Sequence, residues 1–442
     1  MNAEVAIIKT AAETALAQAY AQAHARLPGG KAIAAQRAAA FDVFAREGLP
    51  HRRLEEWKYT DLRALMRDAK PLAAPPDAKA KARASSAGVL VGDVEARRLV
   101  FIDGAFVPEL SDTSALEAGL SVGSLADSLA GGDPALAARF GKVAPASDVA
   151  VALNTALMGD GAVIRIAVGS TIARPIHLLF AASETPAATF TRSLVVVEKG
   201  ARAMLIESHE GPSGSDYQVN AAVELFVGDE AHVDHVKLIG EGADALHVST
   251  LAAAIGARAR FNTFTFIAGG AVVRNQLFLN FDGEDTVAGI RGATLIKGKQ
   301  HADTTLVVNH VARGCQSREM FKSVLDGEAH GVFQGRIIVR QGAQKTDAKM
   351  MTRALLLSER AEADNKPELE IFADDVQCGH GATAGALDDN LKFYLMARGI
   401  PAAEAEALLI RAFLGEAIDG IEHAGLREAL TDSVAAWLKA RE

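Results

Sequence analysis

The chain has 442 residues, of which 49% are hydrophobic and 5% aromatic, so it is long enough for two or three domains or one elongated domain with a large core. Its net charge of −9 excludes the basic surface that non-specific nucleic-acid binding needs, and it disfavours anionic lipid. Two cysteines, Cys315 and Cys378, are too few for a disulfide framework, and no apolar run approaches the roughly 18 residues of a membrane span. We therefore expect a cytoplasmic protein that binds neither nucleic acid nor membrane.

Two regions precede the strand-rich centre of the chain. Residues 1–87 are predicted as an N-terminal helical region that ends in a linker. Apolar residues recur at helical spacing up to about residue 70, and a segment rich in Pro, Ala and Lys (Pro71–Ser86) follows. Residues 88–160 are predicted as a mixed α/β lead-in, with short strands at Val89–Val91 and Arg98–Ile102.

Residues 161–385 are predicted to form one strand after another. Apolar and polar residues alternate, which is typical of half-buried strands, and no helical pattern separates them. Gly200, Gly228 and Gly256 fall at equal steps along the chain, each within a similar turn motif. A glycine corner at a fixed period favours a parallel β-helix, in which each turn packs on the next. The alternative is a β-sandwich, whose turns recur without a long fixed period.

Residues 386–442 are predicted as a C-terminal helical domain. One helix runs from Pro401 to about Asp419, with an apolar stripe of Ala405, Leu408, Leu409, Ala412 and Phe413. A second helix carries Leu426, Leu430, Val434, Trp437 and Leu438. We expect this helical pair to lie away from the strand region. The predicted fold class is therefore mainly β, with a β-helix core between N-terminal and C-terminal α-helical regions.

Four well-known catalytic or binding motifs are absent from the sequence. It contains no G-x-x-x-x-G-K-[ST] phosphate loop, no G-x-S-x-G elbow, no H-E-x-x-H and no C-x-x-C. His232 and His235 have the spacing of metal ligands on a helix, but on a strand they point to opposite faces, which disfavours a metal site. Gly379–Gly385 lies between a strand-like segment and a predicted helix, so a phosphate-binding loop is an alternative interpretation there.

A cysteine and a histidine lie two residues apart near the end of the strand region. In an extended segment Cys378 and His380 point to the same side, and thiolate and imidazole both suit iron. A cluster normally takes four ligands, so a site here has to be open, transient or completed by another chain. The residue types alone favour a simpler interpretation, with Cys378 as a small buried hydrophobe and His380 as a hydrogen-bonding loop residue.

A family resemblance reverses that preference. Residues 344–400, with the run PELEIFADDVQCGHGATAG at Pro367–Gly385, closely resemble the SufD family of the bacterial SUF iron–sulfur cluster assembly system. EEWKYT at Glu55–Thr60, ALNTA at Ala152–Ala156 and VNH at Val308–His310 agree with the same family, in order along the chain. The chain lacks the longer Cys-rich pattern of the paralogous SufB.

The resemblance implies a right-handed parallel β-helix in a non-enzymatic scaffold subunit. Such a subunit pairs with SufB through its β-helix and carries the ABC-type ATPase SufC on its C-terminal helical region, here 386–442. It shares a nascent iron–sulfur cluster with SufB, which places His380 at the interface as a transient iron ligand or proton carrier, with Cys378 beside it. The family is also linked to a reduced flavin at the level of the complex. Unpaired edges of a β-helix let an isolated chain pair with a second copy of itself.

Two functions from other classes remain as alternatives. One is a β-helix carbohydrate-active enzyme, which needs clustered carboxylates and aromatic platforms, whereas the chain has 4 Tyr and 2 Trp. The other is a nucleotide-binding protein that uses Gly379–Gly385.

Overall fold

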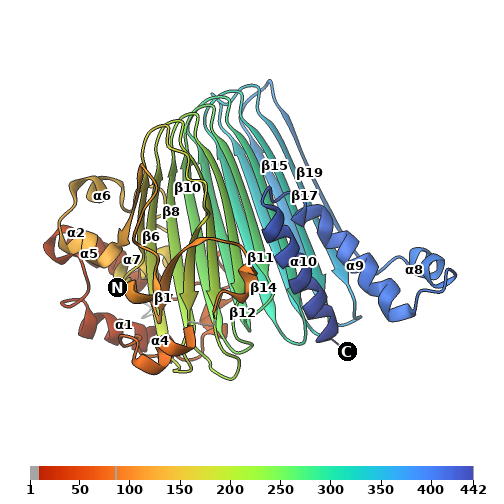
Figure 1. The fold of residues 1–442 in the computed structure, drawn as a ribbon, viewed down its shortest axis with the longest axis horizontal. Coiled ribbons are helices and arrows are strands. Elements are labelled where there is room, and N and C mark those ends of the chain that lie inside the picture. The colour runs from red at the N-terminus through yellow and green to blue at the C-terminus, as the bar shows by residue number, and fades with distance from the viewer. Residues whose placement is uncertain (1–8, 85–86, 442) are drawn as a thin grey trace, which may run out of the picture.

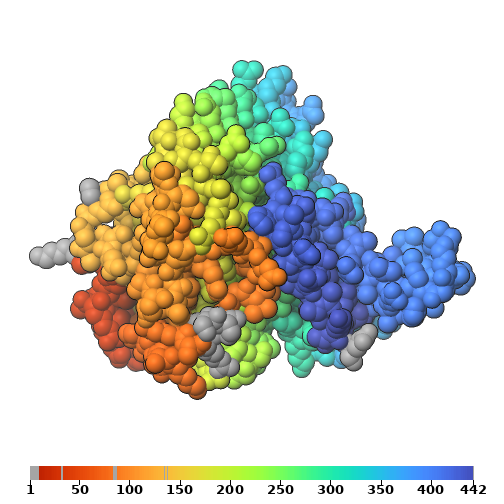
Figure 2. Space-filling model, in the orientation of Figure 1, coloured from red at the N-terminus to blue at the C-terminus, as the bar shows by residue number. Residues whose placement is uncertain are grey.

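The computed structural model describes residues 9–84 and 87–441, so the first eight residues, and Ser85 and Ser86 of the predicted linker, lie outside the described residues. Two parallel sheets wind around one core as a β-helix, with helices at both ends of the chain (Figure 1). The space-filling view shows that the light blue segment before the last two helices projects from the body of the molecule (Figure 2). None of the described helices is long and apolar enough to cross a membrane. The predicted mainly-β fold class with a parallel β-helix core is confirmed.

The strands divide between the two sheets as follows. Sheet A contains β3 (Leu120–Ser124), β4 (Ala162–Ile166), β6 (Ala188–Val197), β8 (Gln218–Val227), β10 (Leu246–Ile255), β12 (Val272–Phe281), β14 (His301–His310), β16 (His330–Val339) and β18 (Glu362–Ile371). Sheet B contains β1 (Arg97–Ile102), β2 (Ala105–Phe106), β5 (Ile176–Ala181), β7 (Arg202–Glu210), β9 (His232–Gly240), β11 (Arg260–Ile267), β13 (Val287–Ile296), β15 (Gln316–Leu325), β17 (Asp347–Leu356) and β19 (Gln377–Gly385).

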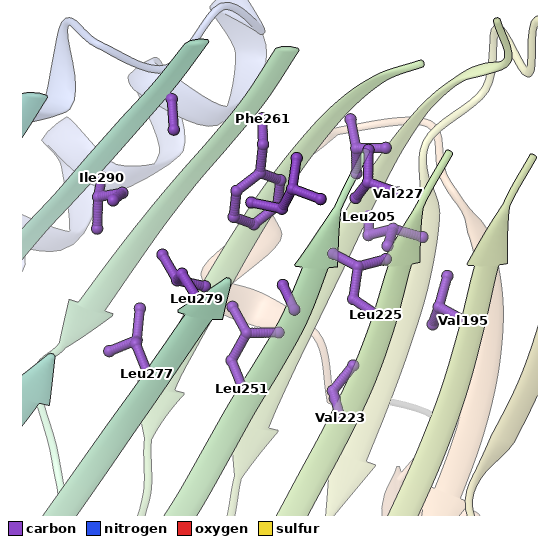
Figure 3. Close-up of a cluster of buried hydrophobic side chains, with 14 of the residues drawn as sticks. Val195, Leu205, Val223, Leu225, Val227, Leu251, Phe261, Leu277, Leu279 and Ile290 are labelled. Atoms are coloured by element: carbon purple, nitrogen blue, oxygen red, sulfur yellow. The ribbon is translucent and has the colours of Figure 1, made fainter. Parts of the chain in front are cut away.

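The chain alternates between the sheets, so each turn adds one strand to each sheet. Neighbouring turns pair in parallel, and paired residues stack directly on one another. Alternate side chains point inward, where aliphatic and aromatic residues of successive turns make contact (Figure 3). Val223, Leu251 and Leu277, which are paired in register, form one such buried row.

Two of the three predicted glycine corners, Gly228 and Gly256, lie where successive turns come very close. At the third, Gly200, a Cβ atom would lie 4.0 Å from the Cα atom of Gly169, and the glycine is instead favoured by a φ of +67°. A Cβ atom at Gly228 would lie 2.7 Å from the backbone nitrogen of Lys199. A Cβ atom at Gly256 would lie 2.8 Å from the backbone nitrogen of Asp229. A larger residue at either of these two corners would push the turns apart, so Gly228 and Gly256 reflect the stacking distance of the β-helix.

Helices of the N-terminal region cover the outer face of sheet A. They are α1 (Ala11–Ala23), α2 (Gly30–Glu47), the 3-10 helix η1 (Glu55–Trp57), α3 (Leu62–Leu65), α5 (Leu125–Ala130), α6 (Pro134–Arg139) and α7 (Val149–Leu157). Phe44, Trp57 and Leu153 from this region form one buried cluster with Phe190 and Val248 of the sheet. The outer face of sheet A is therefore part of a second core.

Trp57 of the EEWKYT segment anchors this region to the sheet. The guanidinium carbon of Arg274, on β12, lies 4.3 Å from the centre of its ring. Arg274 also donates to the backbone oxygen of Glu56 at 2.7 Å and forms a fully buried ion pair with Asp303. Thr60 donates to the same carboxylate. The segment that marks the family resemblance therefore has a structural role.

Two short segments differ from the prediction. The predicted linker contains a helix, α4 (Ala78–Ala84), and the predicted strand Val89–Val91 is a 3-10 helix, η2. Val91 is buried and Leu90 is partly buried against the C-terminal helices. This tertiary contact overrides the strand propensity of the valines. The remaining 3-10 helix is η3 (Pro108–Leu110).

The C-terminal helices do not lie away from the strands, which corrects the prediction. α9 (Ala402–Ile418) and α10 (Ala424–Lys439) bury apolar side chains against Ile206, Phe264 and Leu295 on the outer face of sheet B. The stripe predicted for α9 is correct in part, because Ala405 is buried and Phe413 is partly buried against the cluster, whereas Leu408 is 39% exposed. The fully buried residues of α9 are Ala405, Ile410, Leu414, Ala417 and Ile418. In Figure 1, α8 (Asp389–Met396) projects beyond this packed pair.

We predict that Trp57→Ala lowers the free energy of unfolding by about 3–5 kcal/mol, the usual cost of deleting a buried aromatic side chain. The substitution also leaves the buried Arg274 without the ring on which it lies. Val89→Ala, at a position 76% exposed, is the control and should change the same quantity by under about 0.5 kcal/mol. Urea unfolding followed by circular dichroism measures both variants, and equal effects would contradict the anchoring role.

Candidate functional site

The two ends of the β-helix are built differently. At the N-terminal end the sheets finish on antiparallel strands, because β2 pairs with β1 and β3 pairs with β4. At the C-terminal end, β18 and β19 are the outermost strands of their sheets, and within the described residues each pairs on one side only. Their remaining N–H and C=O groups are a template for a strand from another chain.

Cys378 and His380 both lie on β19, at this open edge. Cys378 is paired in register with Ala348, and His380 with Met350. Ala348 and Met350 belong to the inward-facing core. Because paired residues of a parallel ladder face the same way, Cys378 and His380 both extend from the inward side of the last turn. The structure therefore places the two predicted residues together on the final layer of the core.

The final layer is apolar and uncovered. Leu369 and Val376 are partly buried against the core, whereas Ile371 is 43% and Phe372 58% exposed. Ile371 is paired with Val339 of the preceding turn, which is fully buried. A position that is buried in the preceding turn is thus exposed to solvent in the last one. An exposed apolar patch of this kind is typical of a protein interface.

The environments of the thiol and the imidazole differ. Cys378 is partly buried, and burial, together with the negative charges of Asp347 and Glu319, raises the pKa of its thiol. The thiol therefore stays protonated at neutral pH until a metal ion displaces the proton. His380 is exposed on the rim of the same layer. It is the more accessible of the two as a ligand.

The glycines beside His380 are not needed for packing within the chain. A Cβ atom at Gly379 would have no neighbour within 4 Å among the described residues. A Cβ atom at Gly381 would meet only the flexible side chain of Met351, at 2.8 Å. The open space at Gly379 lets a group from outside the chain approach the backbone next to His380.

Glu319 is a functional candidate that the motif search missed. Glu319 pairs with Met350, which pairs with His380, so two strand spacings of about 5 Å each separate Glu319 from His380. Glu319 is buried, and neither of its carboxylate oxygens accepts a hydrogen bond from the described residues. Burial raises its pKa to about 7. A carboxyl group that titrates there can carry a proton beside the last layer.

The phosphate-loop interpretation of Gly379–Gly385 is wrong. The segment is strand β19, paired along its length with β17, and it is not a loop that opens a helix. The next helix, α8, begins at Asp389 and is already capped by the carboxylate of Asp388, which accepts from the N–H groups of Asn390 and Leu391. An acidic, satisfied helix terminus does not attract a phosphate.

The other candidates lie away from the open edge. His232 and His235 point to opposite faces of β9, as predicted, and His235 is buried in a polar cluster with Glu207 and Lys237. Sequence reasoning missed this cluster, although the alternation of charged residues in two strand patterns was a signal. Cys315 is buried, and its thiol donates to the backbone oxygen of Gly283 at 3.2 Å.

The chain is similar to known proteins over most of its length. The family model described as "SufBD protein N-terminal region" matches residues 10–178, and "SUF system FeS cluster assembly, SufBD core domain" matches residues 179–413. An iron–sulfur cluster assembly SufBD family protein of Synechocystis sp. is 34% identical over 412 residues, 90% of each chain. Escherichia coli SufD is 32% identical over 388 residues, 87% of this chain and 88% of that protein. Bacillus subtilis SufD is 26% identical over 286 residues, 64% of this chain and 65% of that protein.

We predict that ionisation of Glu319 lowers the free energy of unfolding as the pH rises. Because its folded-state pKa of about 7 lies above the ordinary 4.5, its stabilising contribution is complete below pH 4.5 and is lost as the pH rises through 7. Glu319→Gln cannot ionise, so it should raise the free energy of unfolding by about 3 kcal/mol at pH 8 and by much less at pH 5. Denaturant unfolding of both proteins at both pH values measures this difference, and the same variant effect at pH 5 and pH 8 would contradict the assignment.

Proposed function

This chain belongs to the SufBD family of iron–sulfur cluster assembly proteins, and from that premise we propose that it is a SufD-type scaffold subunit that pairs with SufB. The observation that carries the proposal is the Cys378–His380 pair on the last, one-sided strand of the β-helix. The nascent cluster is the cargo of the complex, held between this edge and the partner.

Strand addition explains how pairing assembles the site. When the edge strands of SufB add to β18 and β19, the free ladder groups are satisfied and Ile371 and Phe372 become buried. The same contact brings side chains of SufB over Cys378 and His380. Since this edge offers two ligands and a cluster takes about four, SufB supplies the others.

Different roles follow for the two residues of the edge. His380, exposed on the rim, acts as a transient iron ligand through a neutral ring nitrogen or as a proton carrier. Cys378 has a thiol with a raised pKa and serves as the secondary ligand. Glu319 provides a nearby site for a proton released when the thiol binds metal.

Within the proposed complex the subunits have different roles. The chain itself is a non-enzymatic scaffold, and ATP hydrolysis belongs to SufC. A reduced flavin acts at the level of the complex, which works in the cytoplasm. An isolated chain pairs its open edge with a second copy of itself, because nothing else among the described residues covers β18 and β19.

The surface proposed to dock SufC is α8 with the outer faces of α9 and α10. The apolar faces of α9 and α10 that pack on sheet B are not available to a partner. On α8, by contrast, Phe393 is 73% and Tyr394 54% exposed. A cavity of about 570 Å³ is lined by both α9 and α10, and Lys392 of α8 forms an ion pair with Glu406 of α9 at 2.9 Å. These features form one exposed surface at the end of the chain.

We predict that His380→Ala leaves folding and SufB pairing intact, because an exposed side chain contributes under about 1 kcal/mol to stability. The iron and sulfide content of the co-purified complex should fall about tenfold or more, since even outer-shell changes at metal sites cost roughly 10–100-fold. Cys378→Ser should have a smaller effect. His24→Ala, at an exposed position on α1's C-terminal side, is the control. Wild-type iron and sulfide in an intact His380→Ala complex would refute the role of His380.

We predict that the double change Phe393→Ala, Tyr394→Ala weakens SufC binding by about 2 kcal/mol or more, roughly 30-fold in Kd, because exposed aromatic residues are typical hot spots. SufB pairing should not change. Val168→Ala, at a position 69% exposed on the β-helix, is the control. Calorimetric titration with SufC measures Kd, and an unchanged value would exclude α8 from the docking surface. Deletion from Gly399 onward is unsuitable, because it would uncover the apolar outer face of sheet B.

A further inference from the structure

The outer face of β18 carries a row of charged side chains at the open end of the β-helix. Residues of β16 and β18 that are paired face the same way, and Ile337 and Val339 of β16 belong to the inward-facing core. The even-numbered residues of β18 therefore point outward. They are Glu362, Asp364, Lys366, Glu368 and Glu370. Four of the five outward residues of this last strand are thus acidic.

Arg336 of the preceding turn does not neutralise these acids. Its guanidinium lies 3.5 Å from Glu368, 3.5 Å from Glu370 and 4.0 Å from Glu56 of the N-terminal region. One positive charge is therefore shared among three carboxylates.

The other neighbours leave the row acidic as well. Lys366 lies 3.5 Å from Glu368 and also forms an ion pair with Glu55, so its charge is shared too. Asp364 contacts Nε2 of His330 at 2.7 Å, and an imidazole is charged only when it is protonated. Glu362 is exposed, and among the described residues its carboxylate has no ion-pair partner. The open edge of sheet A therefore carries an excess of negative charge.

Earlier turns show which side chains stack beside charged positions on this face. Arg274 of β12 is paired in register with Asp303 of β14, and the two form a buried ion pair. Arg336 of β16 is paired in register with Glu368 of β18, and these two also form an ion pair. Residues paired across neighbouring strands lie close enough for opposite charges to stabilise the pairing and for like charges to oppose it. A strand added to β18 therefore places its own outward side chains beside the acidic row.

A second copy of the chain does not offer a complementary row. Its β18 would bring acids against acids. On its β19, Cys378 and His380 face inward, so the outward residues are the alternate ones, and none of them is charged. They are Gln377, Gly379, Gly381, Thr383 and Gly385. Pairing with a second copy therefore gains no electrostatic stabilisation from the acidic row.

On the premise that SufB pairs with this end, as proposed above, we propose that the SufB strand that adds to β18 carries Lys or Arg on its outward side. The apolar inward residues of the last layer, such as Leu369 and Ile371, can be buried by any partner strand. The acidic row distinguishes between partners, because only a basic strand forms ion pairs with it. The row thus favours SufB over a second copy of the chain.

Charge reversal in the full chain tests this proposal. The variant Glu362→Lys, Glu370→Lys changes two exposed side chains of the row. At about 0.05 M salt its Kd for SufB should be about tenfold or more above that of the parent. At about 0.5 M salt the difference should shrink to about threefold or less, because salt screens exposed charges. Binding of the parent to SufB should itself weaken with salt, whereas self-association of the parent should not.

Asp93→Lys, Glu95→Lys is the matched control. Both residues are exposed, they precede β1 far from β18 in the sheets, and the double change alters the net charge by the same amount. This variant should bind SufB with the Kd of the parent at both salt concentrations. Circular dichroism checks that all the variants are folded.

The outcomes separate this proposal from the proposed pairing itself. If SufB does not bind the parent at β18 and β19, the pairing fails, and the basic strand fails with it. If SufB binds the parent there, but the reversed variant keeps the parent's Kd at low salt, the pairing stands and the basic strand is refuted. An equal loss of affinity in the control variant would also refute it, because the effect would then come from net charge and not from the row.

Discussion

Backbone pairing between successive turns is the constraint on which this structure depends. Within a parallel β-helix, each strand pairs only with the strands of the turns before and after it. The first and the last strands therefore have backbone N–H and C=O groups that need other hydrogen-bond partners. Antiparallel strands close the first end. At the second end, β18 and β19 keep one side free, and Cys378 and His380 lie on that last strand. The two residues proposed to bind the cluster thus lie where the ladder can accept a strand from another chain.

The helical regions leave this end exposed because they cover other surfaces. The N-terminal region packs on the outer face of sheet A, where Trp57 and Arg274 hold it. The C-terminal pair α9 and α10 packs on the outer face of sheet B. Among the described residues, exposed large apolar side chains occur together in the last layer, at Ile371 and Phe372, and on the projecting helix α8. Two separate exposed surfaces fit a subunit that contacts two different partners in an assembly complex.

The sequence predicts the repetitive parts of this fold well and the long-range contacts poorly. Strand alternation and the corners at Gly228 and Gly256 follow local rules, because each turn repeats the same stacking distance. The covering of sheet B by α9 could not be predicted, since both of its faces carry apolar residues and only the fold decides which is buried, Leu408 or Leu414. Val89–Val91 likewise became a 3-10 helix through contacts with residues more than three hundred positions away.

The residues of the candidate site also differ in how well the sequence predicts them. That Cys378 and His380 lie on the same side of one strand could be predicted, because it requires only an extended backbone between them. Glu319 could not be recognised from the sequence, because its neighbours come from other turns and its raised pKa depends on burial. Residue types alone favoured a structural role for Cys378 and His380, and the family resemblance reversed that preference. The structure adds that both residues lie on a strand whose outer side is unpaired among the described residues.

We propose above all that SufB binds at the open end of the β-helix, at β18 and β19. Hydrogen–deuterium exchange of the full chain tests this most directly. Peptides that cover β18 and β19 should exchange rapidly in the isolated chain at low concentration, where pairing with a second copy is minimal. On addition of SufB, these peptides should become protected, while peptides of α1 and α2 should not change. Unchanged exchange at β19 in a complex that has demonstrably formed, with protection elsewhere, would contradict the account.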